Sequence, residues 1–515
     1  MEAEGVETKQ RIVILGSGWA ALSMLTWLNP YKYDVTIVSP RNYFLWSPLL
    51  SETIVGAVHA DTITEPIRRF SNRQNKPCTF LEASCIGIDT EGHKIRCEGL
   101  CSSENVEVEY DKLIVAIGAG SSQKGVKGAE KFTFPYHDIQ HGVAVRNKLI
   151  DCLERASMPG VSEEKRKELL NFVVIGGSPI AMELAAALYD YSKRELVSSY
   201  PEVADDIQVT LVSSKDHINN IYDSNITRWA RAAFLRERDI NVIRSSIDNI
   251  DSNKITFKKD DDHDAADPVN YTLAVWSRGR MMHPLAQTLA NKIGKDVQTN
   301  GQALVVGPDL VVKGAKDVYA MGDCATIDQG ALVQRWEKIF QKLDVNGDGV
   351  VSPSEFRELI QTLGRQFPAL LEIGKEANEL FELADANKDG QLEIDELKEI
   401  LKIVDRRLTR LPTTAAVAAQ EGKFLAQAFN KDEFDLPSEE RSGFRYKHIG
   451  GYEYVGAEDG FVERGSKSTA IINGPGAWWL WRCTLYSNMV GVQMRLTYVS
   501  DWVSSKLFGA DATRL

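Results

Sequence analysis

The sequence predicts an α/β fold in which one doubly wound, parallel-sheet unit is inserted into another. Two segments, 11–21 and 171–188, each read as an apolar strand, a glycine turn and a helix, and a later strand ends in Gly-Asp at 322–323. Two twelve-residue loops, 344–355 and 385–396, are rich in acidic residues and predict a small helical module. Length and composition agree, since 515 residues with 38 Gly and 17 Pro suit a globular chain of about three or four domains.

Charge and cysteine content narrow the class of protein. The chain carries 72 acidic and 60 basic residues, a formal net charge of −12, so nucleic acid is not an expected partner. Its seven cysteines include no Cys-x-x-Cys pair and indicate reduced, structural thiols. The first ten residues resemble neither a secretory signal nor a transit peptide, and no apolar stretch of about 18 residues predicts a membrane-spanning helix.

The first glycine turn reads Gly-x-Gly-x-x-Ala, with Gly16, Gly18 and Ala21 at its three fixed positions. The first glycine permits a tight turn, the second lets a pyrophosphate approach the backbone, and the small alanine lets the helix pack closely on the strand. Ser39 ends the following strand, where an acid normally binds the ribose, and a serine hydroxyl can also form that hydrogen bond. The segment therefore predicts a Rossmann-like dinucleotide site.

Two later strand ends complete a pattern typical of flavoproteins. The segment 110–119 is an apolar strand that ends near Gly118, and the segment 318–325 ends in Gly322 and Asp323. In flavin reductases with two dinucleotide domains, such a Gly-Asp closes the FAD site and the Asp accepts a hydrogen bond from the ribityl chain. A plain turn at a strand end is the alternative for one segment alone, but three segments in this order favour FAD.

The second glycine turn departs from the usual Gly-x-Gly-x-x-Gly, because its three positions are Gly176, Ser178 and Ala181. A serine Cβ at the middle position crowds the pyrophosphate without excluding it. The next strand runs into Ser213 and Lys215 with no carboxylate, which favours NADPH because an acid there repels a 2′-phosphate. The alternative is that this unit no longer binds a nucleotide.

Both acidic loops follow the EF-hand pattern, with oxygen-bearing side chains at positions 1, 3, 5, 9 and 12 and glycine at position 6. They predict two Ca²⁺ sites, to which the seventh residue lends its carbonyl group. The expected ligands of the first loop are Asp344, Asn346, Asp348, Val350, Ser352 and Glu355. Those of the second loop are Asp385, Asn387, Asp389, Gln391, Glu393 and Glu396.

The last 40 residues predict one helix with an apolar stripe, because large apolar residues recur there at spacings of three or four. The stripe consists of Trp478, Trp481, Leu485, Met489, Val492, Leu496, Val499, Val503 and Leu507. Clustered tryptophans with nearby arginines suit an amphipathic helix that lies in a membrane surface. A dimer interface or ordinary core packing explains the same periodicity.

Taken together, these motifs resemble the type II (alternative) NAD(P)H:quinone oxidoreductases, in particular their external, EF-hand-bearing mitochondrial branch. The resemblance runs nearly end to end and includes the phrases 39–44, 47–50, 151–156, 319–325 and 444–448. It implies a glutathione-reductase-like flavoprotein with non-covalent FAD that passes a hydride from NAD(P)H to the flavin and two electrons to ubiquinone without pumping protons. It also implies peripheral binding to the mitochondrial inner membrane, on the intermembrane-space face, as a homodimer or as part of a membrane complex.

The resemblance assigns roles to individual positions. Glu183 corresponds to a glutamate near the nicotinamide, and Gln420 to the second glutamine of a stretch beside flavin and quinone, whose first glutamine is Ala416 here. The expected FAD residues are Gly16, Gly18, Ala21, Ser39, Pro40, Arg41, Ala116, Gly118, Gly322 and Asp323. The expected NAD(P)H residues are Gly176, Gly177, Ser178, Ser213 and Gly279.

We therefore expect six consecutive regions. They are the first part of the FAD domain (1–150), the inserted NAD(P)H domain (151–300), the closing part of the FAD domain (301–332), the EF-hand pair (333–405), a helix at the FAD and quinone sites (406–440) and a membrane-anchoring region (441–515). The leading hypothesis is a calcium-responsive NAD(P)H:ubiquinone oxidoreductase. Because Ser178, Ala181, Arg278 and Ala416 depart from the family pattern, the alternative is a relative that binds FAD and calcium, has lost dehydrogenase activity and serves a structural role in a membrane complex.

Overall fold

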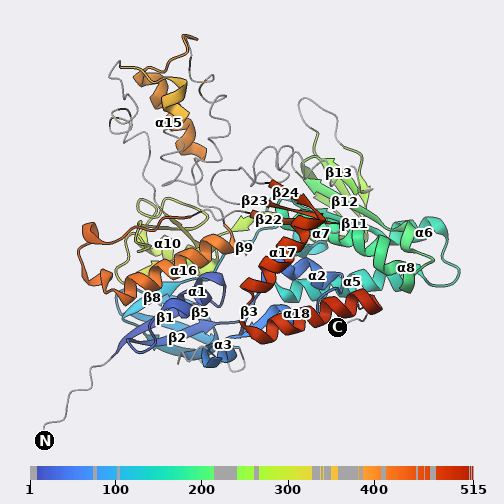
Figure 1. The fold of residues 1–515 in the computed structure, drawn as a ribbon, viewed down its shortest axis with the longest axis horizontal. Coiled ribbons are helices and arrows are strands. Elements are labelled where there is room, and N and C mark those ends of the chain that lie inside the picture. Colours follow the sequence, from blue (N-terminus) through green and yellow to red (C-terminus); the bar gives the residue numbers. More distant parts are fainter. Residues whose placement is uncertain are drawn as a thin grey trace, which may run out of the picture. The chain divides into compact units, whose positions relative to one another are not determined.

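The computed structural model divides the chain into two compact units, which are described separately. The first unit consists of Met1–Phe44, Pro66–Gly120 and Met281–His448, and the second of Leu45–Glu65, Ser121–Arg280 and Ile449–Leu515 (Figure 1). The structure describes residues 9–73, 78–100, 105–213, 240–259, 266–327, 349–357, 387–407, 413–447, 451–456, 459–463 and 471–509, together with 337, 340, 381, 385, 511 and 513. The four short strands β3 (Tyr43–Leu45), β4 (Thr64–Pro66), β9 (Gly120–Ser121) and β18 (Arg280–Met281) lie where the chain passes between the units.

A seven-stranded sheet forms the core of the first unit, in the order β20-β8-β1-β2-β5-β6-β7. The pairs from β20 to β5 are parallel, whereas β5, β6 and β7 form an antiparallel extension. The strands are β1 (Gln10–Leu15), β2 (Tyr33–Ser39), β5 (Thr79–Asp89), β6 (Lys94–Gly99), β7 (Asn105–Glu109), β8 (Lys112–Val115) and β20 (Val318–Ala320). Strands β1, β2, β8 and β20 lie where the sequence predicts them, and their apolar runs are buried because helices cover a parallel sheet.

Helix α1 (Trp19–Trp27) packs against α16 (Ala415–Asn430), although 387 residues lie between their nearest ends, Trp27 and Ala415. The two backbones approach so closely that a Cβ on Gly422 would collide with the carbonyl oxygen of Ala20. The Ser23 hydroxyl donates to the Ala419 carbonyl oxygen at 2.6 Å and fixes the register of the two helices. The remaining elements of this unit are α3 (Ile67–Arg73), α10 (Pro284–Ile293), β19 (Leu304–Val306), β21 (Ala325–Ile327) and α15 (Ile394–Arg407).

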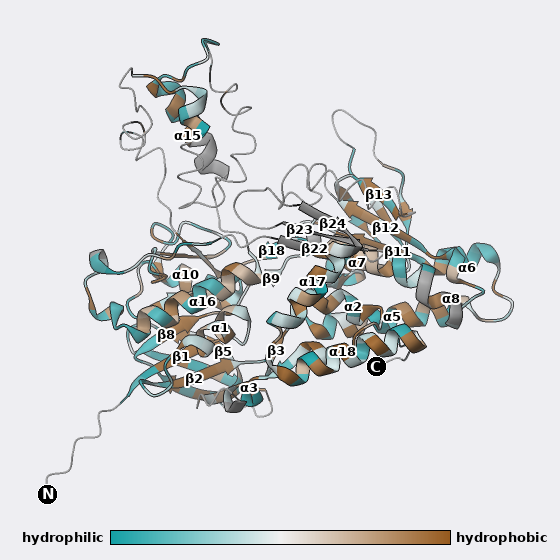
Figure 2. Ribbon diagram, viewed as in Figure 1, coloured by the Kyte–Doolittle hydropathy of each residue, from teal (hydrophilic) through white to brown (hydrophobic). Residues whose placement is uncertain are grey.

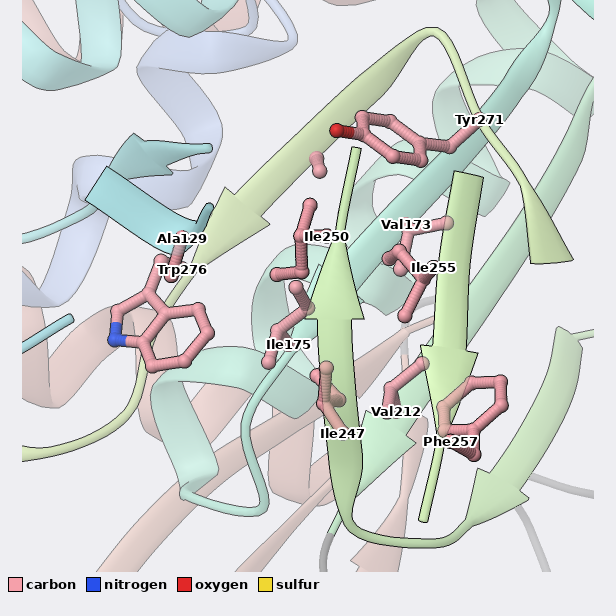
Figure 3. Packing of buried hydrophobic residues seen from close by; sticks show 11 residues of the cluster. Ala129, Val173, Ile175, Val212, Ile247, Ile250, Ile255, Phe257, Tyr271 and Trp276 are labelled. Carbon is pink, nitrogen blue, oxygen red and sulfur yellow. The ribbon is translucent and has the colours of Figure 1, made fainter. Parts of the chain in front are cut away.

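The second unit contains a five-stranded parallel sheet in the order β10-β17-β11-β12-β13. Its strands are β10 (Phe134–Pro135), β11 (Asn171–Ile175), β12 (Gln208–Ser213), β13 (Ile240–Arg244) and β17 (Leu273–Trp276). A three-stranded antiparallel sheet of β14 (Ile247–Ile250), β15 (Lys254–Phe257) and β16 (Val269–Asn270) packs against it through a cluster of buried residues (Figure 3). The helices are α2 (Leu50–Ile54), α4 (Ala129–Phe132), α5 (Ile139–Ala156), α6 (Glu163–Leu169), α7 (Pro179–Asp190) and α8 (Leu196–Ser199).

The C-terminal part of the second unit contains two helices, so the prediction of a single helix is wrong. A small sheet of β22 (Gly451–Gly456), β23 (Asp459–Glu463) and β24 (Ile471–Gly474) leads into α17 (Pro475–Asn488) and then α18 (Gly491–Phe508). The break falls before Gly491, which has φ +82°, a conformation that favours glycine. Among the described residues, no helix is both long and apolar enough to span a membrane.

The predicted apolar stripe divides at this break. Trp478 and Trp481 on α17 are each only 4 % exposed, whereas Leu496 and Leu507 on α18 are 62 % and 70 % exposed. Leu485 and Met489 belong to the buried half, and Val492, Val499 and Val503 to the exposed half. Figure 2 shows brown, hydrophobic segments along both helices, interrupted by white and teal ones. Core packing therefore explains the first half of the stripe, and only the second half forms an exposed apolar row.

Candidate cofactor, nucleotide and calcium sites

The glycine turn of the first unit shows two different reasons for glycine. Gly16 has φ +109°, and a Cβ there would collide with the Ala116 carbonyl oxygen, so the protein itself requires glycine. Gly18 has φ −87°, and a Cβ there would meet no protein atom within 4 Å. The fold itself therefore does not require glycine at this second position. A pyrophosphate that lies close to the backbone at the start of α1 would require it.

Ser39 lies at the carboxyl end of β2, where the sequence predicts a ribose contact. Its side chain is buried, and its hydroxyl lies 3.0 Å from the Ser17 hydroxyl and accepts a hydrogen bond from the Arg41 amide at 3.1 Å. Residues 39–41, which include Pro40, thus form a turn next to the glycine turn at the end of β1. Because β1 and β2 are adjacent and parallel, Ser39 and Gly16 lie at the same edge of the sheet.

The two other strand ends meet this edge as predicted. Ala116 and Gly118 follow β8, and Gly322 and Asp323 follow β20, which pairs with β8 in parallel. Gly118 has φ +69° with open space around it, and Gly322 has φ +73°. The buried Cys324 thiol donates to the Val115 and Met321 carbonyl oxygens, both at 3.2 Å, and holds the Gly-Asp turn against β8. Nine of the ten predicted FAD residues therefore lie at one edge of this sheet, and Ala21 lies in the first turn of α1.

Glu421 on α16 is a residue of this site that the sequence analysis missed. Its side chain is only 4 % exposed, and its Oε2 accepts a hydrogen bond from the Gly322 amide at 2.6 Å. Burial raises the pKa of Glu421 to about 8, and the negative charge of Asp323 adds to the increase while the amide bond opposes it. The carboxyl group is thus neutral at neutral pH. The sequence signal that could have indicated this burial is the spacing of the helix. Glu421 lies four residues from both Val417 and Leu425, on the buried face.

Gln420, the predicted contact beside flavin and quinone, has a different set of partners. Its amide nitrogen donates to the Lys447 carbonyl oxygen at 3.0 Å, and its amide oxygen accepts from the Lys447 amide at 2.9 Å. The phenyl rings of Phe424 and Phe444 stack edge to face beside this pair. In this arrangement Gln420 fixes the segment 441–447 to α16.

The glycine turn of the second unit is intact despite its altered sequence. Gly176 has φ +154°, and a Cβ there would meet the Ser277 carbonyl oxygen at 2.5 Å. Gly177 follows it, and the Ser178 hydroxyl accepts a hydrogen bond from the Ala181 amide at 3.4 Å, which caps the N-terminus of α7. Ala181 is fully buried beside Gly176, so a small residue is required there. Ser178 therefore has a local structural role that the sequence analysis did not foresee.

The other predicted nucleotide residues lie at the same carboxyl edge. Ser213 is the buried last residue of β12, and Gly279, with φ +76°, follows β17. Glu183 projects from the second turn of α7 and is partly exposed. The pKa of the buried Tyr136 hydroxyl is raised by burial and then by the charge of Glu183, while a hydrogen bond with the Ser51 side chain lowers it. Tyr136 is thus a neighbour of Glu183 that no sequence motif indicates, and Ser51 is hydrogen-bonded to Tyr136.

The second EF-hand loop is described except for residue 386 and is folded around its acidic side chains. The Asp385 carboxylate accepts hydrogen bonds from the Asp389 and Gly390 amides at 3.1 and 2.9 Å. Further acceptors are Asn387, Asp389 and Glu396, which bind the amides of Asp389, Gln391 and Glu393. Gly390 has φ +78°, the sharp turn that the sixth position of this loop requires.

The first loop is described only from Gly349 onwards, so Asp344, Asn346 and Asp348 lie outside the described residues. Glu355 accepts hydrogen bonds from the Ser352 amide and hydroxyl at 2.9 and 2.7 Å. Val351, next to Val350, pairs with Leu392 through two backbone hydrogen bonds of 2.9 Å, which joins the two loops. Among the described residues, no three His, Cys, Asp or Glu side chains lie close enough to hold one ion. The donor set nevertheless fits Ca²⁺, since an EF-hand also uses amide and carbonyl oxygens.

Two polar anchors hold the C-terminal helices within the second unit. Arg482 on α17 forms a buried ion pair with Glu52 at 3.0 Å and donates to the Tyr498 hydroxyl at 2.7 Å. Asp501 on α18 accepts from the His59 amide at 3.0 Å and the Thr62 hydroxyl at 2.6 Å. These contacts orient α18, and its apolar row is left exposed on the opposite side.

Fold and sites together define an oxidoreductase class with two dinucleotide-binding units. The family model described as pyridine nucleotide-disulphide oxidoreductase matches residues 10–342, the EF-hand domain pair matches 333–402, and the NDH2 C-terminal domain matches 448–511. The chain belongs to the alternative NAD(P)H-ubiquinone oxidoreductases, the type II or NDH2 family.

Individual relatives cover nearly the whole chain. External alternative NAD(P)H-ubiquinone oxidoreductase B3, mitochondrial, of Arabidopsis thaliana is 34 % identical and aligns over 99 % of this chain and 92 % of its own. The external alternative NADH-ubiquinone oxidoreductase, mitochondrial, of Yarrowia lipolytica is 26 % identical over 98 % and 81 %. The structure of Plasmodium falciparum NDH2 in complex with NADH has a TM-score of 0.81 and 25 % identity over 98 % of this chain and 100 % of that chain. The predicted family and fold class are thus confirmed.

Proposed function

We propose that the protein binds FAD in its first unit, oxidises NAD(P)H bound in its second unit and reduces ubiquinone at a membrane surface without moving protons across the membrane. The names of the relatives support the donor and the acceptor. The observation that carries the cofactor assignment is the open space at Gly18, at the start of a helix and beside the Ser39 and Gly322 turns. The bound flavin would supply the two-electron chemistry.

In this proposal, the residues of the first unit hold and orient the cofactor. The Gly18 backbone and the start of α1 take the pyrophosphate, Ser39 faces the ribose, and Asp323 accepts from the ribityl chain. The neutral Glu421 fixes the turn that carries Asp323 through its bond with the Gly322 amide. In the second unit, the turn at Gly176 takes the pyrophosphate of NAD(P)H, and Ser213, in place of an acid, favours NADPH over NADH.

We further propose that the exposed row of α18 lies in a membrane surface, with the two EF-hand loops as Ca²⁺ sites that regulate turnover. Five apolar side chains on one face, from Val492 to Leu507, support a lipid contact, since a large exposed apolar patch marks an interaction surface. The words "external" and "mitochondrial" in the relatives' names support the inner membrane and its intermembrane-space face. In EF-hand sensors, Ca²⁺ binding opens the angle between the two helices, and this change regulates the protein that carries the module.

Anaerobic mixing with NADH or NADPH tests the enzyme function directly. We expect the visible flavin absorbance to bleach, faster with NADPH, and to return when a soluble ubiquinone is added. Ser213→Glu is the matched variant for donor choice and is expected to reverse the preference toward NADH. If neither nucleotide bleaches the flavin, with or without Ca²⁺, the protein is a binding relative and not a dehydrogenase.

A further inference from the structure

Arg278 lies at the carboxyl edge of the sheet in the second unit, beside the glycine turn. The Ser277 amide donates to the Ile175 carbonyl oxygen at 2.8 Å, and the Ser122 amide donates to the Gly279 carbonyl oxygen at 3.2 Å. The backbone is therefore fixed on both sides of Arg278. The Ser277 carbonyl group lies directly against Gly176, so Arg278 is at the edge where a Rossmann sheet binds its ligand.

The Arg278 guanidinium is half-buried, and within the described residues it forms no ion pair with a carboxylate. Its recorded neighbour is the ring of Trp276, whose centroid is 5.7 Å away. Burial lowers the pKa of Arg278. Two other partly buried arginines of this unit are paired with carboxylates: Arg166 with Asp206 at 2.9 Å and Arg482 with Glu52 at 3.0 Å.

A desolvated cation without an anionic partner is unfavourable, and an arginine in this state marks a site for a phosphate or carboxylate ligand. The order of the strands in the sheet indicates which phosphate of the dinucleotide would lie near Arg278. Strand β17, which carries Arg278, lies on one side of β11, whereas β12, which ends at Ser213 on the adenosine-ribose side, lies on the other. Arg278 therefore lies beside the glycine turn that follows β11, and away from the ribose that carries a 2′-phosphate in NADPH.

We propose that Arg278 binds the pyrophosphate of the dinucleotide, a contact that NADH and NADPH share. This inference rests on the proposed nucleotide site of the second unit. It gives a ligand-binding role to Arg278, which departs from the family pattern. The guanidinium adds positive charge beside a turn whose middle glycine is replaced by Ser178. Donor choice stays with Ser213, because Arg278 contacts a group common to both donors.

The test is equilibrium binding of ADP-ribose, which contains the pyrophosphate, and of AMP, which does not, to the flavin-loaded protein. We expect Arg278→Met to weaken ADP-ribose binding about tenfold, the usual effect of losing one hydrogen bond to a charged group, and to leave AMP binding unchanged. Arg278→Lys is expected to recover part of the loss, because lysine keeps the charge without the planar fork. Arg155→Met, which removes an exposed arginine of the same unit, is the control and is expected to change neither ligand.

Steady-state kinetics supply the second readout. KM for NADH and for NADPH is expected to increase by the same factor in Arg278→Met and in a second variant, Arg278→Gln. The inference would be overturned if Arg278→Met bound ADP-ribose as tightly as the wild type, or if its AMP binding weakened as much as its ADP-ribose binding. It would also be overturned if the ratio of the KM values for NADPH and NADH changed, or if the wild type did not bind ADP-ribose. Absence of flavin bleaching with normal, Arg278-dependent ADP-ribose binding would refute the oxidoreductase function alone.

Discussion

The neutral carboxyl group of Glu421 predicts a specific dependence of stability on pH. In the folded protein its pKa is about 8, whereas a glutamate in the unfolded chain has a value near 4.5. Between these two values the folded state holds a proton that the unfolded state has lost, so the free energy of unfolding decreases as pH rises. The slope approaches about 1.4 kcal/mol per pH unit, and the loss between pH 6 and pH 8 is about 2 kcal/mol.

Glu421→Gln isolates this effect, because the amide oxygen still accepts from the Gly322 amide while the side chain no longer titrates. We expect the variant to lack the additional loss of stability between pH 6 and pH 8, and to exceed the wild type most clearly at pH 8. The assay is denaturant unfolding of the flavin-loaded protein, followed by flavin fluorescence because the cofactor would report on the unit that contains Glu421. Glu440→Gln, which changes an exposed carboxylate of the same unit, is the control and is expected to follow the wild type.

Equal pH dependence in the wild type and in Glu421→Gln would refute this reasoning. It would mean that Glu421 is ionised in the folded state or that its pKa does not differ from that of the unfolded chain. A variant that loses flavin at every pH would show instead that the carboxyl group itself is needed at the turn. The comparison of slopes and the comparison of flavin content separate these two outcomes.

Four further substitutions have effects that are predicted from the described contacts. Gly16→Ala is expected to destabilise the protein by roughly 3 kcal/mol or more, through positive φ and a backbone collision, whereas Gly18→Ala is expected to leave thermal unfolding of the flavin-free protein unchanged and to reduce retained flavin, measured by absorbance. Leu496→Glu on the exposed row is expected to reduce co-flotation with liposomes without a change in circular dichroism, and equal flotation of this variant and the wild type would assign lipid binding to another surface. Glu396→Gln is expected to abolish Ca²⁺ binding at the second loop, so calorimetry would lose one site, and an undiminished stoichiometry would exclude Glu396 as a ligand.

The parts of the fold that could be predicted are those that depend on local sequence. A turn such as that at Gly16 requires glycine for reasons that lie within a few residues, and the apolar strands before and after it are buried on both faces. The order of the glycine turns along the chain then indicates which unit is inserted into which. The motif pattern assigned Ser39, Gly322 and Asp323 to one site, and the structure brings them to one sheet edge because parallel strands that share a sheet end at the same side.

Residues defined by distant partners could not be predicted in this way. Glu421 is 99 residues from the amide that it binds, and a Glu in a helix is usually exposed. Gln420 has its amide partners 27 residues further on, and Ser178 is a helix cap as well as a departure from a motif. In each case the residue type was known but its partner was not, and the partner decides whether a polar side chain binds a ligand or the protein itself.

The C-terminal stripe shows the same limit for apolar residues. Spacings of three and four place Trp481 and Leu496 on one continuous face of an uninterrupted helix, but periodicity does not state what covers that face. The break before Gly491 changes the direction of the chain, and the two halves then meet different surroundings. Arg482 ties the first half to Glu52, so that its tryptophans fill the protein core. Asp501 ties the second half to the backbone of His59, on the side of α18 opposite the apolar row, so the row faces outward. Lipid is therefore the occupant proposed for α18 alone, and substitutions on α17 are expected to affect folding before they affect membrane binding.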